Sequence, residues 1–151
     1  MNKSDFVEIL IVEDNVNDAK LAQLALSQEK LANNLIWLKD GAQALDFLFG
    51  EGEYAGREVS NTPKLILLDL KMPKVGGIEV LKKIRGDERT RHIPVAVMTS
   101  SSEEKDIIEA YNLWVNSYIV KPVDFDKFAK CVKEVGLYWL VVNHPPINDK
   151  R

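Results

Sequence analysis

Five polar side chains of the sequence each follow a short apolar run and could act together in one site. They are Glu13 and Asp14 after the first run, Asp69 after the third, Thr99 after the fourth and Lys121 after the fifth. Ligands of open α/β sheets bind outside the carboxyl ends of the strands, so we expect all five at one edge. The sequence thus predicts a site with three carboxylates, one hydroxyl and one ammonium.

Three carboxylates at one edge need a compensating cation. Two ionised carboxylates about 4 Å apart repel each other by roughly 4 kcal/mol at an effective dielectric constant of about 20. Either the pKa of one of these carboxyl groups rises or a metal ion binds. Carboxylate and carbonyl oxygens suit a hard ion such as Mg²⁺, whose other coordination positions are taken by water and phosphate oxygens. Lys121 would then hold a further phosphate oxygen, and Thr99 would donate a hydrogen bond to phosphate.

Asp69 is the candidate nucleophile of this site. An ionised carboxylate can attack phosphorus and form an aspartyl phosphate when a cation screens the repulsion between the two groups. Catalysis would consist of positioning and charge neutralisation, without a general base. The sequence fits this chemistry, because His92 lies in a loop and His144 in the C-terminal tail, where we expect both to be solvated.

The elements that must position these residues alternate between strands and helices. The expected strands are Phe6–Val12, Leu35–Leu38, Lys64–Leu68, Val95–Met98 and Ser117–Val120, and the expected helices are Val16–Lys30, Ala42–Phe49, Ile78–Arg85, Glu103–Asn112 and Asp124–Leu140. Ser101 and Glu104, three residues apart, predict a capping box at the start of the fourth helix. The alternation predicts an α/β fold with a doubly wound, five-stranded parallel sheet and five helices.

Composition and charge narrow the class of protein. The chain has 151 residues, 46% hydrophobic and 28% charged, which is enough apolar material for one soluble globular domain. A net charge of −3 disfavours nucleic acid as a direct partner. The longest apolar run, Leu137–Val142, is far shorter than the about 20 residues of a membrane span, so we expect no membrane partner. Cys131 is the single cysteine, which indicates a reducing, cytoplasmic compartment.

These motifs resemble the receiver domains of two-component response regulators. The matching segments are Ile11–Asn15 (IVEDN), Leu67–Pro73 (LLDLKMP) followed by Gly76 and Gly77, Ile93–Thr99 (IPVAVMT) and Ser117–Pro122 (SYIVKP). The resemblance covers about residues 5–140 and implies a flavodoxin-like receiver fold. Residues 141–151 are then expected to form a C-terminal tail without an effector domain, so that output passes through contacts of the receiver domain itself.

The resemblance also implies a role for each site residue. It makes Asp69 the phosphoacceptor, assigns Mg²⁺ to Glu13, Asp14, Asp69 and the backbone carbonyl of Lys71, and makes Lys121 the phosphate-binding lysine. Thr99 and Tyr118 match the paired switch residues, Lys71 and Ser101 match positions that govern the lifetime of the phosphoryl group, and Pro122 matches a cis proline.

The implied function is that of a stand-alone response regulator. A sensor histidine kinase would supply the phosphoryl group, and phosphorylation would change the surface made by the fourth helix, fifth strand and fifth helix, where a downstream protein binds. The chain would catalyse only its own phosphorylation and slow dephosphorylation. Leu45–Gly50 (LDFLFG) and Val123–Phe128 (VDFDKF) resemble the single-domain subgroup that includes phytochrome-associated regulators, which implies a phytochrome-like kinase.

The last helix also raises the question of self-association. One apolar stripe, made of Phe125, Phe128, Val132, Val135 and Trp139, can be buried against the sheet. Further apolar residues lie outside the stripe, namely Cys131, Leu137, Tyr138 and Leu140. They predict either a homodimer or additional internal packing.

Three other functions remain as alternatives. A haloacid-dehalogenase-like phosphatase also uses a nucleophilic Asp, but it needs a second Asp two positions later, where this chain has Lys71. A flavodoxin-like flavin protein would need a phosphate-binding loop after the first strand, and Glu13 and Asp14 would repel phosphate there. The third alternative is an inert receiver-like scaffold that acts only through protein contacts.

Trp114 departs from the pattern of the resemblance, since the family commonly has glycine at this position. If the residue must adopt a left-handed backbone conformation, a side chain there costs about 1–2 kcal/mol. We therefore expect either a different end to the fourth helix or a partner that packs against Trp114.

Overall fold

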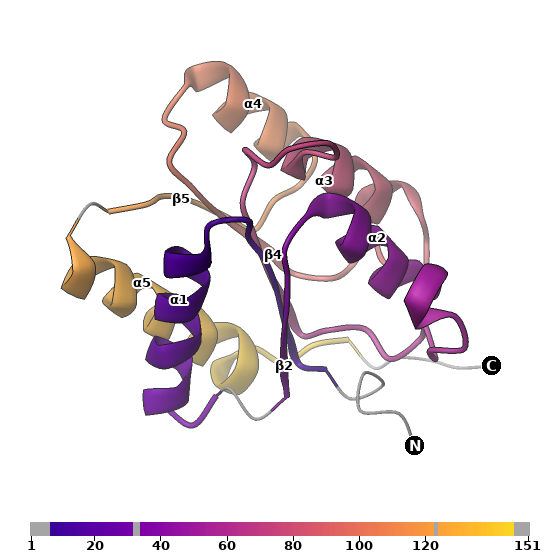
Figure 1. Ribbon diagram of the computed structural model, residues 1–151, viewed down its shortest axis with the longest axis horizontal. Helices are drawn as coiled ribbons and strands as arrows, with labels where there is room; N and C mark the ends of the chain where they lie inside the picture. Colours follow the sequence, from indigo (N-terminus) through magenta and orange to yellow (C-terminus); the bar gives the residue numbers. More distant parts are fainter. Residues whose placement is uncertain (1–6, 32–33, 123, 147–151) are drawn as a thin grey trace.

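The structure, a computed structural model, describes residues 7–31, 34–122 and 124–146. Within them the chain alternates between strands and helices (Figure 1). The strands are β1 (Ile9–Val12), β2 (Leu35–Leu38), β3 (Leu65–Leu68), β4 (Val95–Thr99) and β5 (Ser117–Val120). The α-helices are α1 (Val16–Gln28), α2 (Gly41–Phe49), α3 (Gly77–Gly86), α4 (Glu104–Asn112) and α5 (Phe125–Leu137), with a 3-10 turn η2 (Gly52–Tyr54) and a π-helical turn η3 (Tyr138–Val142).

The five strands form one parallel sheet in the order β2-β1-β3-β4-β5. Helices α1 and α5 cover one face, and α2, α3 and α4 cover the other (Figure 1). The doubly wound α/β class predicted from the sequence is therefore confirmed. The order also places the carboxyl ends of β1 and β3 side by side, because Val12 pairs with Leu68.

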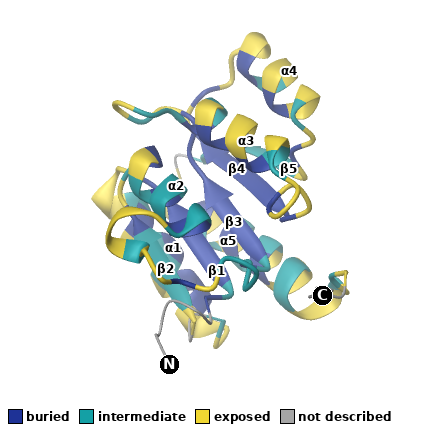
Figure 2. Cartoon of the chain, turned by 90° about the vertical axis from the view of Figure 1, so that its right-hand side faces the viewer, coloured by how far each residue is buried: buried dark blue, intermediate teal, exposed yellow. Residues whose placement is uncertain are grey.

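Strand side chains alternate between two cores on opposite faces of the sheet. In β1, Leu10 and Val12 join the core under α2, α3 and α4, whereas Ile9 and Ile11 join the core under α1 and α5. Figure 2 shows the inner strands β1, β3 and β4 buried between the helical layers, whereas the edge strands β2 and β5 are only partly buried. Burial on both faces explains why the strands carry apolar runs rather than an alternating pattern.

The capping box expected at the start of α4 is wrong. The helix begins at Glu104 after Glu103, and no side chain caps it. The Ser101 hydroxyl instead accepts a hydrogen bond from the Glu103 N–H at 3.3 Å and donates one to Asp106 Oδ2 at 2.5 Å. A buried carboxylate thus accepts the hydrogen bond of the Ser101 hydroxyl, and the Ser101 N–H donates to the Thr99 hydroxyl rather than to Glu104.

The limits of the predicted domain and tail are described only in part. Residues 5 and 6 of the expected domain, Val123, and residues 147–151 of the expected tail lie outside the described residues. Among the described helices, none has both the length and the apolar character that a membrane span requires.

Candidate functional site

The three carboxylates expected from the sequence lie together at the carboxyl edge of the sheet. Carboxylate oxygens of Glu13, Asp14 and Asp69 lie within 4.8 Å of one another. The parallel pairing of β1 with β3 produces this arrangement, since the Asp69 N–H donates to the Val12 carbonyl at 3.0 Å. Glu13 and Asp69 are buried and Asp14 is exposed, so the cluster opens to solvent on one side.

Glu13 is fixed at the end of β1 by backbone and side-chain hydrogen bonds. Its N–H donates to the Leu38 carbonyl at 3.0 Å, and its own carbonyl accepts a bond from Trp37 Nε1 at 2.8 Å. The Asn15 N–H donates to Glu13 Oε2 at 3.1 Å. The Glu13 backbone is therefore held from β2, and its carboxylate is held from the start of α1.

Lys121 reaches the same cluster from the end of β5. Its ammonium nitrogen lies 2.6 Å from Glu13 Oε1, 2.8 Å from Asp18 Oδ2 and 3.5 Å from Asp69 Oδ2. The side chain is only 11% exposed. The structure thus brings together four of the five side chains singled out at the strand ends, and the ammonium is shared among several carboxylates.

The pKa values of Glu13 and Lys121 reflect their burial and the charges that they place next to each other. Burial raises the pKa of Glu13 to about 8, the bond from Lys121 opposes this rise, and the neighbouring charge of Asp69 adds to it. Burial lowers the pKa of Lys121, but its bonds to Asp18 and Glu13 and the charge of Asp69 outweigh burial and raise that pKa above its ordinary value. One ammonium does not satisfy this cluster, which by its oxygen donors suits a hard divalent cation.

Asp18 is a residue of the site that sequence reasoning missed. It lies in the first turn of α1, and its N–H donates to the Asn15 side chain that caps this helix. The available signal was its position, three residues after Asn15 in the first turn of the helix that directly follows Glu13 and Asp14. Its contact with Lys121 links elements at opposite ends of the sequence and could not be foreseen.

The loop after β3 brings its backbone close to Asp69. The Lys71 N–H donates to Asp69 Oδ1 at 3.3 Å. The Gly77 N–H donates to the Leu70 carbonyl at 3.0 Å, and a Cβ at Gly77 would lie 2.3 Å from the Asp69 carbonyl oxygen. Only glycine permits this close approach of α3 to the acceptor strand, which explains the residue in physical terms.

Thr99 and Tyr118 are connected through Ser101. The Thr99 side chain is fully buried, and its hydroxyl accepts a bond from the Ser101 N–H at 3.3 Å. The Tyr118 hydroxyl donates to the Ser101 carbonyl at 2.9 Å. The two residues expected to act as a pair therefore contact the same residue of the loop between β4 and α4.

Asp106 is a second residue that sequence reasoning missed. It is buried in the first turn of α4, accepts the Ser101 bond and forms an ion pair with Lys71 Nζ at 3.0 Å. The hydrogen bond from Ser101, and next the bond from Lys71, hold the pKa of Asp106 below its usual value. In the sequence Asp106 is one of several acidic residues near a helix start, and nothing distinguishes it.

Two details of the resemblance have different outcomes. Trp114 has a φ of 58°, so the left-handed conformation considered from the sequence is present, with the side chain 79% exposed. The described residues contain no cis peptide bond, so the expectation for Pro122 is wrong. The bond preceding this proline has the trans form, which X–Pro sequences favour by about 0.5–1 kcal/mol.

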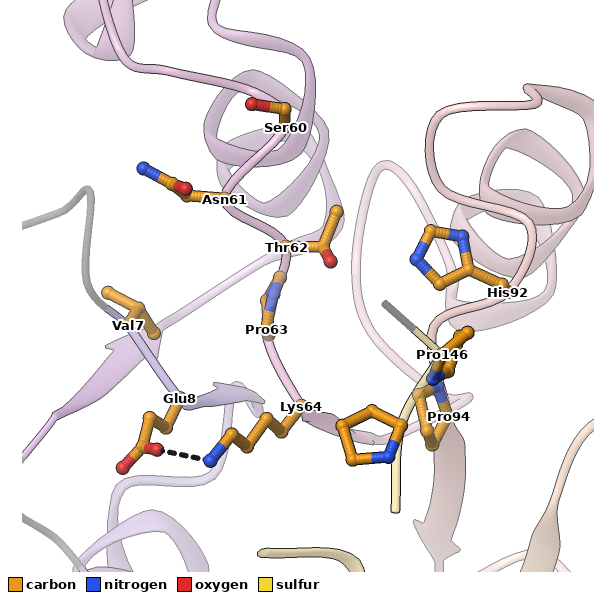
Figure 3. Close-up of a pocket in the computed structure, with 11 residues that line it drawn as sticks. Val7, Glu8, Ser60, Asn61, Thr62, Pro63, Lys64, His92, Pro94 and Pro146 are labelled. Carbon is orange, nitrogen blue, oxygen red and sulfur yellow. Dashed lines mark ion pairs between the residues drawn. The ribbon is translucent and has the colours of Figure 1, made fainter. Parts of the chain in front are cut away.

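A pocket at the opposite, amino end of the strands has different chemistry. It has a volume of about 300 Å³ and lies where Glu8, Lys64 and Pro94 precede their strands (Figure 3). Its carboxylate, Glu8, is paired with Lys64 at 2.8 Å. The acidic cluster at the carboxyl edge is therefore the stronger candidate for chemistry.

Comparisons with known proteins agree with this geometry. Residues 9–133 match the family model of the response regulator receiver domain. The chain is 43% identical over 139 residues to the probable methanogenesis regulatory protein FilR2 of Methanothrix harundinacea (strain 6Ac), covering 91% of this chain and 86% of that protein. It is 42% identical over 132 residues to the response regulator Rcp1 of Synechocystis sp. (strain ATCC 27184 / PCC 6803 / Kazusa), covering 87% of this chain and 88% of that protein.

Solved structures show the same fold. The phosphorylated cyanobacterial phytochrome response regulator RcpA superposes with a TM-score of 0.85 at 39% identity, covering 91% of this chain and 96% of that one. The Mn²⁺-bound form of Rcp1 superposes with a TM-score of 0.84 at 39% identity, covering 91% of this chain and 97% of that one. The acidic cluster and a metal-bound relative together support divalent-metal binding. The chain belongs to the response regulator receiver domain family.

Proposed function

We propose that this chain is a response regulator that accepts a phosphoryl group on Asp69 from a sensor histidine kinase. The observation that carries the proposal is the convergence of Glu13, Asp14, Asp69 and Lys121 at one edge of the sheet. This set combines an oxygen nucleophile with cation ligands and a fixed ammonium. Such a site performs phosphoryl transfer by positioning and charge neutralisation.

In the transfer step an oxygen of the Asp69 carboxylate forms a bond to phosphorus. The bond between phosphorus and the donor atom breaks, and its electron pair leaves with the donor. Lys121 then holds a phosphoryl oxygen, since its ammonium already lies 3.5 Å from Asp69 Oδ2. Lys71 donates its backbone N–H beside the acceptor, 3.3 Å from Asp69 Oδ1.

We assign the proposed cation site to Glu13, Asp14, Asp69 and the backbone carbonyl of Lys71. Oxygen donors of this kind favour Mg²⁺. The cation supplies positive charge that screens the attacking carboxylate from the phosphoryl oxygens. Asp14, as the exposed member of the carboxylate cluster, offers the route from solvent.

The proposed switch couples the phosphoryl group to the loop between β4 and α4. Phosphorylation adds a charge of about −1.5 to −2 at Asp69 and attracts the Thr99 hydroxyl. The Thr99 hydroxyl accepts the Ser101 N–H, and Ser101 accepts the Tyr118 hydroxyl, so a movement of Thr99 alters both contacts. The surface of α4, β5 and α5 would then change its affinity for a downstream protein.

The partners follow from the family and from exposed side chains. Receiver domains accept phosphate from histidine kinases, and the similarity to RcpA supports a phytochrome-like kinase for this chain.

A homodimer is the second proposed association, because Phe125, Leu137 and Tyr138 are exposed. Cys131 and Leu140, by contrast, pack against the core under α1 and α5, as the internal alternative predicted. A cytoplasmic location and the absence of other enzymatic activity stay predictions.

The test is intact-mass spectrometry after incubation with Mg²⁺ and acetyl phosphate. We expect one phosphate adduct on the wild type, none on Asp69→Asn, and an adduct on the matched control Asp126→Asn, which changes an exposed carboxylate of α5. Addition of EDTA should prevent the adduct. An adduct on both wild type and Asp69→Asn, or on neither, would reject the proposal in favour of the inert scaffold.

A further inference from the structure

Asp106 is a buried carboxylate that the proposed phosphotransfer does not use. It lies in the first turn of α4, and its side chain is 9% exposed. One oxygen, Oδ2, accepts both the Ser101 hydroxyl at 2.5 Å and the Lys71 ammonium at 3.0 Å. A buried carboxylate with two such partners is held in a defined position.

These two contacts join the loop that contains Asp69 to the loop that follows Thr99. Lys71 belongs to the loop after β3, and Ser101 belongs to the loop after β4. Lys71 is attached to the site at its backbone, where its N–H donates to Asp69 Oδ1 at 3.3 Å, while its ammonium is held by Asp106. The printed contacts of the described residues thus join the Lys71 ammonium to Asp106 and not to Asp69, although the Lys71 backbone lies beside the acceptor.

Phosphorylation would set up a competition for the Lys71 ammonium. A phosphoryl group on Asp69 places a charge of about −1.5 to −2 beside the Lys71 backbone, against the single negative charge of Asp106. Lys71 is 51% exposed, so its ammonium could exchange between the two anions without unpacking a core. The position of the ammonium then decides how open the phosphoryl group is to water.

We propose that Asp106 is a positioning residue that shortens the lifetime of the phosphoryl group by holding the Lys71 ammonium away from it. The inference rests on the proposed function and extends it to the rate of dephosphorylation. With Lys71 bound to Asp106, the solvent side of the phosphoryl group stays open. With Lys71 released, its side chain covers that side and slows hydrolysis.

The reaction concerned is hydrolysis of the aspartyl phosphate. A water oxygen forms a bond to phosphorus, the bond between phosphorus and the Asp69 oxygen breaks, and the electron pair remains on the carboxylate. The protons of the water leave with the inorganic phosphate. No further reactant is required, so access of water controls the rate.

The decisive experiment is a double-mutant cycle on the dephosphorylation rate constant. Asp106→Asn keeps an oxygen that can accept the Ser101 bond but loses the charge that holds Lys71. We expect this variant to lose phosphate about threefold to fivefold more slowly, the factor carried by a partly exposed ion pair. Lys71→Met alone should change the rate little, and it should abolish the effect of Asp106→Asn in the double variant.

Controls separate this role from a structural one. Glu104→Gln removes a neighbouring exposed charge of α4 and should leave the lifetime unchanged. The rate of phosphate acceptance and the midpoint of urea unfolding should be similar in the wild type, Asp106→Asn and Glu104→Gln. A slowing by Asp106→Asn that persists without Lys71, or a lifetime equal to that of the wild type, overturns the inference.

A measurement on the unphosphorylated protein keeps the two proposals distinguishable. NMR relaxation of the Lys71 side chain should show a restricted ammonium in the wild type and a mobile one in Asp106→Asn. Equal mobility in both overturns the inference, whatever the outcome of phosphorylation. If the wild type accepts no phosphate but its Lys71 side chain is restricted, Asp106 does hold Lys71. The proposed function and the proposed effect on the phosphoryl lifetime are then both overturned.

Discussion

The ammonium of Lys121 lies 2.6 Å from the carboxylate of Glu13, although these residues follow strands at different positions of the sheet, β5 and β1. The Glu13 side chain is buried, at 8% exposure, and the Lys121 side chain is 11% exposed. Glu13 is also a member of the carboxylate cluster proposed to hold a divalent cation. Lys121 and the cation therefore compete for the same carboxylate.

Replacement of Lys121 by methionine should strengthen Mg²⁺ binding and weaken phosphate acceptance. Removal of about 1 kcal/mol of competing attraction corresponds to about fivefold tighter binding. Isothermal titration calorimetry measures the affinity, and intact mass measures the adduct. The control Lys20→Met removes an exposed lysine of α1 and should change neither quantity. Unchanged or weaker Mg²⁺ binding in Lys121→Met would contradict the competition.

Replacement of Thr99 by alanine should separate phosphorylation from the conformational change. Asp69 and the carboxylate cluster are intact in this variant, so it should still accept phosphate. The Ser101 N–H loses its partner, the Thr99 hydroxyl, so the amide signals of Ser101 and Tyr118 should no longer shift on phosphorylation in NMR spectra. Thr99→Ser, which restores a hydroxyl, should restore the shifts. Wild-type shifts in Thr99→Ala would reject this route.

Replacement of Gly77 by alanine should destabilise the fold and impair phosphate acceptance. The added Cβ would lie 2.3 Å from the Asp69 carbonyl oxygen, a backbone atom that can move only with its strand. Forced overpacking of this kind costs about 1–3 kcal/mol. Urea unfolding measures the cost.

Gly86, at the other end of the same helix, provides the matched control for Gly77. A Cβ there meets nothing within 4 Å. Gly86→Ala should therefore be neutral or stabilising, by up to about 1 kcal/mol, because alanine favours helices. Equal destabilisation by the two substitutions would show that the close approach at Gly77 is not the cause.

Replacement of Trp114 by glycine should stabilise the protein relative to Trp114→Ala. The residue has a φ of 58° after the end of α4, and the Trp114 and Val115 N–H groups donate to the carbonyls of Tyr111 and Ala110. Glycine adopts this left-handed conformation about 1–2 kcal/mol more readily than a residue with a Cβ. Both variants remove the same exposed indole, so urea unfolding isolates the backbone cost. Equal stability of Trp114→Gly and Trp114→Ala would contradict a backbone cost at this position.

The sequence by itself determined the fold class and the edge at which the site lies. Apolar runs such as Leu65–Leu68 can be buried only in a sheet covered on both faces, which fixes parallel strands and crossover helices. In such a sheet the residues after β1, β3, β4 and β5 meet at the carboxyl edge. Glu13, Asp69 and Lys121 were therefore predictable from local pattern and topology together.

Only the tertiary structure decided which polar groups contact one another. Asp18 and Asp106 both lie in first turns of helices, where an acidic residue is favoured by the helix dipole whether or not it has another role. Their contacts with Lys121 and Lys71 depend on how separate loops pack at the sheet edge. Side-chain pairing of this kind is a property of distances in space, and no spacing along the chain encodes it.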